Sequence, residues 1–257
     1  MSQNSVTILA RELLSCYIGQ DYHNALGGEG AKVAMALLEH RGAVAMRGQT
    51  VISLDIPLLW QLSGYGTVVT LMQLPTSLRS KGMATGLHGA FGQAGIPFRL
   101  GFMRGATRRV ETLLEGRCDA IVTSKMTARL DMEQGRPITL IHAFAFNTFV
   151  QEYVVAFQNP QARQIVSGMR VALDPVSIDQ TILTSYECQG KEVEFIQAPY
   201  VQSLDKLAAG ELDAVIWSRD ELKEWGLGFN LQPLRDPSGW PERIPWQCWP
   251  PVETRRD

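Results

Sequence analysis

Two stretches of the chain follow the same residue pattern, and this duplication restricts the possible folds more than any other feature of the sequence. One copy covers residues 110–124 and the other residues 204–218. Each copy contains an amphipathic helical segment, a glycine (Gly116 or Gly210), two further residues, an Asp-Ala pair, two β-branched residues, one further residue and a serine. Because glycine readily takes the left-handed conformation that ends a helix, each copy predicts a helix followed by a strand.

The two copies lie at matching points of two longer series in which strand-like and helix-like segments alternate. Such alternation is typical of βαβ units, which build parallel sheets. The first series predicts strands over 68–72, 98–103 and 120–123, with helices over 77–93 and 107–115. The second predicts strands over 170–173, 193–197 and 214–217, with helices over 177–187 and 201–209. A nearly uncharged, β-rich stretch over 137–157 separates the series, so we expect two equivalent α/β lobes.

The N-terminal part of the chain lacks this alternation. Apolar residues at helical spacing predict a first helix over 5–18, with Ser5 as its N-cap. A glycine-rich break over 25–30 follows, and a second helix is expected over 31–40, ending at Gly42. Two β-prone runs around a glycine-containing turn, 44–46 and 50–53, predict a hairpin.

Composition and cysteine spacing indicate where a protein of this kind works. The chain has 257 residues and a formal net charge of −2, so no global field attracts it to nucleic acid or to an anionic membrane. Its four cysteines form no CxxC pair and no cluster with histidine, which fits reduced thiols. The N-terminus lacks the pattern of a secretory signal, and no apolar stretch approaches the roughly 18 residues needed to span a bilayer. We therefore expect a soluble, cytoplasmic protein.

Several short motifs give this chain a family resemblance. They are the runs at 81–87, at 103–106 with 109–111, at 172–174 with 177, 179 and 180, and at 213–217. These runs resemble the YhfZ family of transcriptional regulators, over about residues 70–234. The resemblance implies a two-lobed, periplasmic-binding-protein-like domain of type II, which bacterial regulators use as an effector sensor, joined to a small winged-helix head.

The expected organisation combines this resemblance with the residue patterns. Residues 1–65 form a degenerate winged-helix-like head, because the break between its two helices is short for a complete middle helix. Residues 66–234 form the two-lobed domain, with lobe 1 at about 66–140, lobe 2 at about 150–218, and crossovers near 141–150 and 219–230. Residues 235–257 hold five prolines and three tryptophans without periodicity, which predicts an irregular tail.

Candidate ligand-binding residues in lobe 1 follow from a rule of α/β sheets, which bind ligands at the carboxyl ends of their strands. The turns at these ends supply Gln73, Pro75, Thr76, Ser77, Arg104, Gly105, Ala106, Thr123, Ser124 and Lys125. Hydroxyl groups and helix N-termini favour anions, and a guanidinium binds a carboxylate or phosphate through two hydrogen bonds. The competing interpretations are ordinary helix caps and a surface ion pair of Arg104 with Glu111 or a neighbouring acid.

The same rule, extended by the resemblance, selects candidates beyond lobe 1. Lobe 2 supplies Asp174, Ser177, Tyr200, Trp217 and Ser218, and the resemblance places Thr148 and Glu152 of the crossover in the cleft. A carboxylate at Asp174 could accept from an amine or hydroxyl of a ligand. Structural alternatives are a capping box formed by Ser177 and Gln180, core packing for Trp217, and a solvent-facing position for the crossover residues.

Motifs of known catalytic chemistry are missing from the sequence. It contains no GxSxG elbow, HExxH, P-loop or GxGxxG pattern, and its four histidines have no metal-ligand spacing. Cys118 beside Asp119 is the nearest approach to a nucleophile, but it precedes its strand. We expect no enzyme activity, no cofactor and no metal site.

The head carries few of the basic residues that bind DNA. Over residues 1–56, four basic and five acidic side chains give a net charge of −1. Lys32, Arg41 and Arg47 could still form a local patch where a winged helix contacts phosphate. Alternatively, the head is a dimerisation or docking module in which Ala34, Met35, Leu37 and Leu38 pair helix to helix.

The sequence thus supports two principal functional hypotheses. The first is a homodimeric, ligand-responsive, DNA-binding transcriptional regulator whose two-lobed domain binds a small anionic or zwitterionic metabolite. The alternative is a cytosolic small-molecule-binding protein without DNA binding. A weaker third hypothesis, an enzyme on the same fold, would require turnover of the bound ligand.

Overall fold

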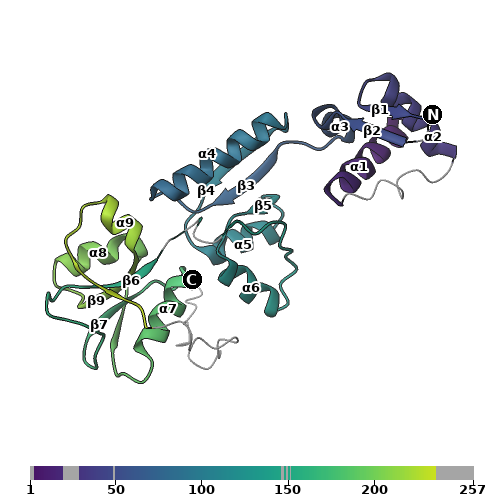
Figure 1. Ribbon diagram of the computed structural model, residues 1–257. Coiled ribbons are helices and arrows are strands. Elements are labelled where there is room, and N and C mark those ends of the chain that lie inside the picture. The colour runs from purple at the N-terminus through teal and green to yellow at the C-terminus, as the bar shows by residue number, and fades with distance from the viewer. Residues whose placement is uncertain are drawn as a thin grey trace. The chain divides into compact units, whose positions relative to one another are not determined.

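The protein, studied as a computed structural model, is described over residues 3–19, 29–48, 50–145, 148, 150 and 152–235 (Figure 1). These residues divide into two compact units. One contains the chain up to Thr70 together with Thr85–Leu100, and the other contains Leu71–Ala84 and the chain from Gly101 onward. The proline- and tryptophan-rich tail after Arg235 and most of the glycine-rich break lie outside the described residues. Within those ranges, no helix is long and apolar enough to cross a membrane.

The described part of the head contains three helices and a hairpin. Its elements are α1 (Gln3–Gly19), α2 (Glu29–His40), β1 (Val44–Arg47), β2 (Thr50–Leu54) and α3 (Ile56–Ser63). The second helix and the antiparallel hairpin are confirmed. The prediction of Ser5 as an N-cap is wrong, because α1 begins at Gln3 and Ser5 lies inside its first turn.

Helix α3 was not predicted, although its local signals are present. Asp55 is its N-cap and accepts a hydrogen bond from the Leu58 backbone N–H at 2.9 Å. Gly64 ends the helix in the left-handed conformation, with φ of 70°. With a proline in the first turn, these residues match the usual start and stop of a helix. At eight residues, the segment is too short for a clear apolar period.

The helices of the head pack around a core of their own. Buried members are Val6, Leu9, Ala10, Leu13, Leu14, Ala34, Met35, Leu38, Ala43, Val44 and Leu59. The α1 residues in this set recur every three or four positions and form one stripe of the helix. Ala34, Met35 and Leu38 are buried in this core, so they cannot pair with a second head. Of the four residues suggested as a dimerisation surface on α2, only Leu37 is exposed, at 40%.

Lobe 1 is built on a three-stranded sheet in the order β4-β3-β5. Its strands are β3 (Val68–Met72), β4 (Phe98–Phe102) and β5 (Ala120–Ile121), and its helices are α4 (Leu78–Gln93), α5 (Ala106–Leu114) and α6 (Lys125–Glu133). All three predicted strands are present, β5 being shorter than expected. The short helix α6 was not predicted.

Lobe 2 contains a five-stranded sheet in the order β10-β6-β9-β7-β8. The strands are β6 (Tyr153–Phe157), β7 (Arg170–Leu173), β8 (Glu194–Gln197), β9 (Ala214–Ser218) and β10 (Asn230–Pro233). The helices are α7 (Ile178–Cys188), α8 (Tyr200–Ala208) and α9 (Arg219–Glu224). β7 pairs with β8 and β9 in parallel, whereas β6 is antiparallel to β9 and β10.

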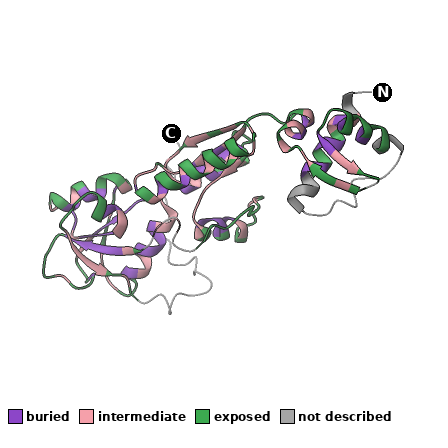
Figure 2. Cartoon of the chain, turned by 45° about the horizontal axis from the view of Figure 1, so that its top comes forward, coloured by how far each residue is buried: buried purple, intermediate pink, exposed green. Residues whose placement is uncertain are grey.

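The central strand β9 is buried along its whole length (Figure 2). Val215 and Trp217 pack under α8 and α9, while Ala214 and Ile216 pack with side chains of α7 on the opposite face. This division follows from the two-residue period of a strand. A strand covered by helices on both faces explains why the predicted run is uniformly apolar.

One prediction about the crossover is wrong. Residues 137–157 were expected to be β-rich, but among the described residues of this stretch only β6 is a strand, and residues 137–145 have no regular structure. A strand requires a neighbour for its backbone N–H and C=O groups. The apolar side chains here are also uncovered, with Leu140, Ile141 and Phe144 at 47%, 79% and 46% exposure.

The duplicated pattern keeps its geometry in both lobes. Gly116 and Gly210 have φ values of 69° and 72°, so both take the left-handed conformation after a helix. In lobe 2, Asp213 also accepts from the backbone N–H of Arg170 at 2.8 Å and forms an ion pair with its guanidinium at 2.9 Å. Hydrogen bonding to Arg170 lowers the pKa of Asp213. This carboxylate therefore ties the entrance of β9 to that of β7.

Candidate ligand-binding site

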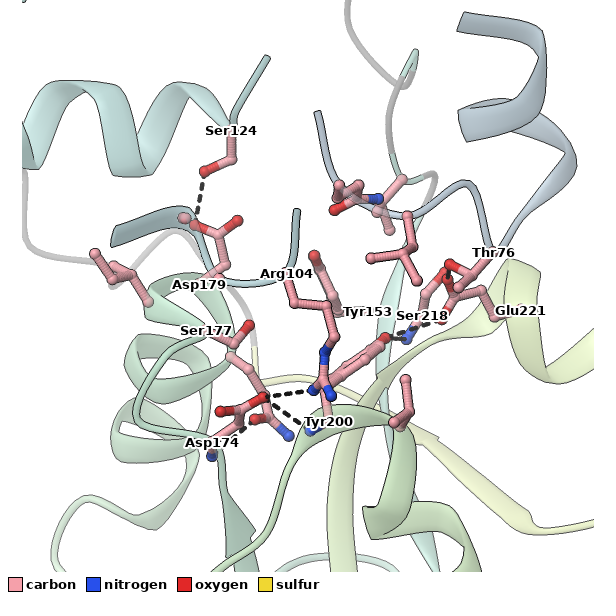
Figure 3. Close-up of a pocket in the computed structure, with 18 of the residues that line it drawn as sticks. Thr76, Arg104, Ser124, Tyr153, Asp174, Ser177, Asp179, Tyr200, Ser218 and Glu221 are labelled. Atoms are coloured by element: carbon pink, nitrogen blue, oxygen red, sulfur yellow. Dashed lines mark hydrogen bonds and ion pairs between the residues drawn. The ribbon is translucent and has the colours of Figure 1, made fainter. Parts of the chain in front are cut away.

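A cavity of about 120 Å³ lies where turns of both lobes converge, within the second compact unit (Figure 3). Ten of the predicted site residues line it: Gln73, Thr76, Arg104, Gly105, Ala106, Ser124, Asp174, Ser177, Tyr200 and Ser218. They come from the carboxyl ends of strands and the first turns of the helices that follow. The rule for α/β sheets thus locates the cavity.

The other predicted residues do not line the cavity: Pro75, Ser77, Thr123, Lys125, Thr148, Glu152 and Trp217. Ser77 is buried and shares a hydrogen bond of 3.1 Å with Ser80. Thr148 donates to the carbonyl of Ala145 at 2.5 Å, and Glu152 forms an ion pair with Arg219 at 2.9 Å.

The four remaining members of this group differ in how far they are buried. Pro75 is half-buried in the turn after β3, Lys125 is exposed at the start of α6, and the Thr123 hydroxyl is buried. Trp217 is fully buried in the lobe 2 core, where its ring stacks on Tyr200 with centroids 3.6 Å apart. Trp217 therefore influences the cavity through the lining residues Tyr200 and Glu221, whose pKa its side chain lowers.

Residues that were not predicted to bind a ligand complete the lining. They are Leu74, Arg109, Val150, Tyr153, Ile178, Asp179, Gln180, Val201 and Glu221. The charged ones, Arg109, Asp179 and Glu221, lie within the first turns of α5, α7 and α9 rather than at strand ends. A wider rule that includes one helical turn beyond each strand would have found them.

The expected capping box at the start of α7 is absent, and this prediction is wrong. Ser177 holds the N-cap position, but its side chain makes no capping hydrogen bond. The Gln180 side chain accepts from the backbone N–H of Asp174 at 3.0 Å instead. The hydroxyl of Ser177 therefore remains available to the cavity that it lines.

Asp174 holds the turn together and contacts the opposite lobe. Its carboxylate accepts from the backbone N–H groups of Val176 and Tyr200, at 3.1 and 2.8 Å. It also lies 3.5 Å from a guanidinium nitrogen of Arg104. Arg104 thus pairs with Asp174 and not with Glu111. The Asp174 carboxylate, which was expected to accept from an amine or hydroxyl of a ligand, therefore already accepts from donors of the protein.

Lobe 1 presents donors to carboxylates of lobe 2 on both sides of the Arg104–Asp174 pair (Figure 3). On one side, Asp179 accepts from the hydroxyl groups of Ser124 and Thr127 at 2.6 and 3.0 Å. On the other side, Glu221 accepts from the hydroxyl of Thr76. The cavity is therefore bounded by three contacts between the lobes.

Gly105 contributes a close approach between the two lobes. Its φ of +82° is unfavourable for other residues, and a Cβ atom there would lie 3.2 Å from the backbone oxygen of Val176. A side chain at this position would therefore meet Val176 of lobe 2. Gly105 still lines the cavity.

Burial alters the ionisation of several cavity groups. It raises the pKa of Asp179, an effect opposed by the hydrogen bonds from Ser124 and Thr127 and by the charge of Arg109. Burial lowers the pKa of Arg109 to about 10 and raises the pKa of Tyr153. Among the described residues, no group of three or more His, Cys, Asp or Glu side chains is arranged to hold a metal ion.

The pKa of Glu221 predicts how stability depends on pH. Burial raises this pKa, and the side chains of Thr76, Tyr200 and Trp217 oppose the rise. Between the ordinary glutamate pKa and the raised value, the unfolded chain binds fewer protons than the folded chain, so stability falls as pH rises. In thermal unfolding without ligand, the Tm of the protein minus that of Glu221→Gln should increase from pH 8 to pH 5. A constant difference would contradict a raised pKa.

Comparisons with known proteins agree with this architecture. A model of the YhfZ C-terminal domain matches residues 55–238. The uncharacterized protein YhfZ of Escherichia coli (strain K12) is 32% identical over 213 residues, which cover 80% of this chain and 68% of that protein. A crystal structure of YhfZ from Shigella flexneri superimposes with a TM-score of 0.57 and 33% identity, covering 71% of this chain and 76% of the other.

A more remote likeness extends to periplasmic binding proteins. The alkanesulfonate-binding protein SsuA from Xanthomonas axonopodis pv. citri is 12% identical, with a TM-score of 0.48 over 67% of this chain and 61% of that protein. The chain itself has a two-lobed α/β architecture with a helical N-terminal region.

Proposed function

We propose, from the premise that this chain belongs to the YhfZ family, that it is a ligand-responsive transcriptional regulator. Its two-lobed domain binds a small anionic or zwitterionic metabolite, and its head binds DNA. The observation that carries the proposal is the cavity, which combines residues of both lobes with hydrogen bonds between them. A ligand that contacts both walls stabilises the closed arrangement of the lobes, because it binds that arrangement best.

Support for ligand binding comes from the mixture of groups around the cavity. Arg104 offers a guanidinium at the end of β4, where a carboxylate or phosphate can be bound through two hydrogen bonds. Ser177 and Ser218 add hydroxyl groups, and Leu74 and Val201 add apolar surface. A few polar groups set among apolar ones are typical of small-molecule sites.

Support for DNA binding comes from the order of elements in the head. Helix α2 is followed directly by the β1–β2 hairpin, which is the order of a recognition helix and its wing. Lys32 lies on α2, Arg41 follows it and Arg47 lies at the hairpin tip, and all three side chains are exposed. We propose that they contact phosphate, and that a homodimer in the cytoplasm presents two heads to an operator.

The decisive experiment measures binding of the full chain to a labelled duplex from upstream of its own gene, by fluorescence anisotropy across a salt series. We expect submicromolar binding that exceeds binding to a scrambled duplex. The triple variant Lys32→Ala, Arg41→Ala, Arg47→Ala should bind more weakly. Its slope of log affinity against log salt should be smaller by about 0.9 for each phosphate that the variant no longer neutralises.

A charge-matched control separates this effect from the loss of net positive charge. Arg117, Arg129 and Lys223 are exposed residues outside the head, and their triple alanine variant should bind DNA like the unmodified protein. If the folded protein shows no binding at low salt, the regulator proposal fails. The second candidate function, a small-molecule-binding protein without DNA binding, would then be favoured, in keeping with the head's net charge of −1.

A further inference from the structure

The charges around the cavity are unbalanced. Lobe 1 contributes the two cations Arg104 and Arg109, and lobe 2 contributes the three carboxylates Asp174, Asp179 and Glu221. With every group ionised, two positive and three negative charges leave a net charge of −1. Asp174 faces Arg104, and Asp179 interacts with the charge of Arg109. Glu221 is the carboxylate that remains.

Glu221 is buried among neutral partners. It is 5% exposed, and its carboxylate accepts from the hydroxyl groups of Thr76 and Tyr200, the latter at 3.1 Å. The Tyr200 oxygen itself accepts from the backbone N–H of Ser218 at 3.4 Å, so the Tyr200 proton is directed at Glu221. The charged group that affects Glu221 most is another carboxylate, Glu224. Burying a carboxylate with neutral partners is costly, and a cation in the cavity would offset that cost.

Arg104, in contrast to Glu221, is partly exposed and has a charged partner. Its side chain is 38% exposed, and its ion pair with Asp174 is long, at 3.5 Å. A guanidinium has five N–H donors in a planar fork. Arg104 therefore retains donors for a carboxylate in the cavity that it lines.

These observations restrict the ligand to one chemical class, and the restriction rests on the proposed small-molecule binding. We infer that the ligand is a small amino acid or a closely related ammonium carboxylate. Its ammonium group binds Glu221 beside the Tyr200 hydroxyl, and its carboxylate binds Arg104. The cavity of about 120 Å³ favours a compact molecule, because pockets for drug-sized ligands measure roughly 300–1,000 Å³.

The test uses pairs of molecules that differ only in the ammonium group. Binding of L-alanine, L-serine and L-aspartate to the full chain would be compared by calorimetry with that of L-lactate, L-glycerate and L-malate, which carry a hydroxyl group instead. We expect at least one amino acid to bind ten times more tightly than its hydroxy acid. Glu221→Gln should remove this preference, while Glu211→Gln, which alters an exposed carboxylate paired with Lys206, should retain it.

Two further variants distinguish a specific role of Glu221 from general damage to the site. Arg104→Met should weaken the binding of amino acids and of hydroxy acids alike, since both classes carry the carboxylate. Tyr200→Phe removes one hydroxyl partner of Glu221 and retains the ring. It should weaken the binding of amino acids more than the binding of hydroxy acids. This variant also keeps the test usable if Glu221→Gln does not fold.

The outcomes separate the ligand class from the broader function. Hydroxy acids that bind as tightly as amino acids, or an ammonium preference that survives Glu221→Gln, would overturn the inference and leave small-molecule binding intact. Failure of all six compounds to bind would overturn the inference as well. The DNA-binding measurement would then decide separately whether the chain is a regulator.

Discussion

Replacement of Trp217 by alanine should lower the free energy of unfolding by about 3–5 kcal/mol, the usual cost of truncating a fully buried tryptophan. Trp217 lies in the central strand of lobe 2 and is 0% exposed. Its ring stacks on Tyr200 and contacts Trp225 edge to face, with centroids 6.0 Å apart. The substitution removes these contacts and leaves a cavity that β9, paired on both sides, cannot collapse to fill.

Urea unfolding followed by circular dichroism would measure this loss. Trp225→Ala is the matched control, because Trp225 belongs to the same lobe but is 41% exposed. Its substitution should cost clearly less. Equal effects of the two substitutions would show that the core of lobe 2 does not depend on Trp217 as its burial indicates.

Replacement of Asp174 by alanine should have the second-largest effect, about 2–4 kcal/mol, because a buried donor left without its acceptor costs about 1–3 kcal/mol. The Asp174 carboxylate is 2% exposed and accepts from two backbone N–H groups, those of Val176 and Tyr200. Its loss also releases Arg104 from its ion pair. The variant should therefore destabilise the turn that begins α7 and loosen the start of α8.

The same urea experiment serves for Asp174, with two comparisons. Asp174→Asn keeps one acceptor oxygen and should recover part of the stability. Asp205→Ala, an exposed position on α8, should change stability little. If Asp174→Ala were no more harmful than Asp205→Ala, the hydrogen bonds of Asp174 would have no structural importance.

Strands were easier to predict than short helices, for a physical reason. The predicted strands 68–72 and 170–173 match β3 and β7 to the residue. Polar turns on both sides of an apolar, β-prone run mark where the strand begins and ends. Helices α3, α6 and α9 contain six to nine residues and show no sustained period. Their capping residues were the remaining signal, and single capping residues also occur in turns.

The candidate site could be predicted only as far as strand ends define it. Ser124 and Ser218 follow from the position of the duplicated pattern, and both line the cavity. Trp217 differs from Ser218 by one position, and the alternation of a strand turns it into the core. Arg109 and Glu221 lie in the first helical turn after a strand, so a rule limited to strand ends misses them, and a rule extended by one turn includes them.

For the head, the order of elements favours DNA binding, whereas the small number of basic residues does not. The hairpin after α2 fits a wing, and the exposed Lys32, Arg41 and Arg47 are available for phosphate. Their number is small for a DNA-binding surface. For this reason the salt dependence of binding, which reflects how many phosphates are neutralised, is more informative than affinity alone.

The unequal sheets of the two lobes imply that resistance to local unfolding is distributed unevenly across the ligand-binding domain. In lobe 2, β9 is paired on both sides and buried throughout, so its amide hydrogens exchange with solvent only when the whole lobe unfolds. In lobe 1, β5 contains two half-buried residues, and small fluctuations suffice to expose its amides. Under the proposed function, lobe 2 would therefore form the more rigid wall of the cavity, and a bound metabolite would increase the order of lobe 1.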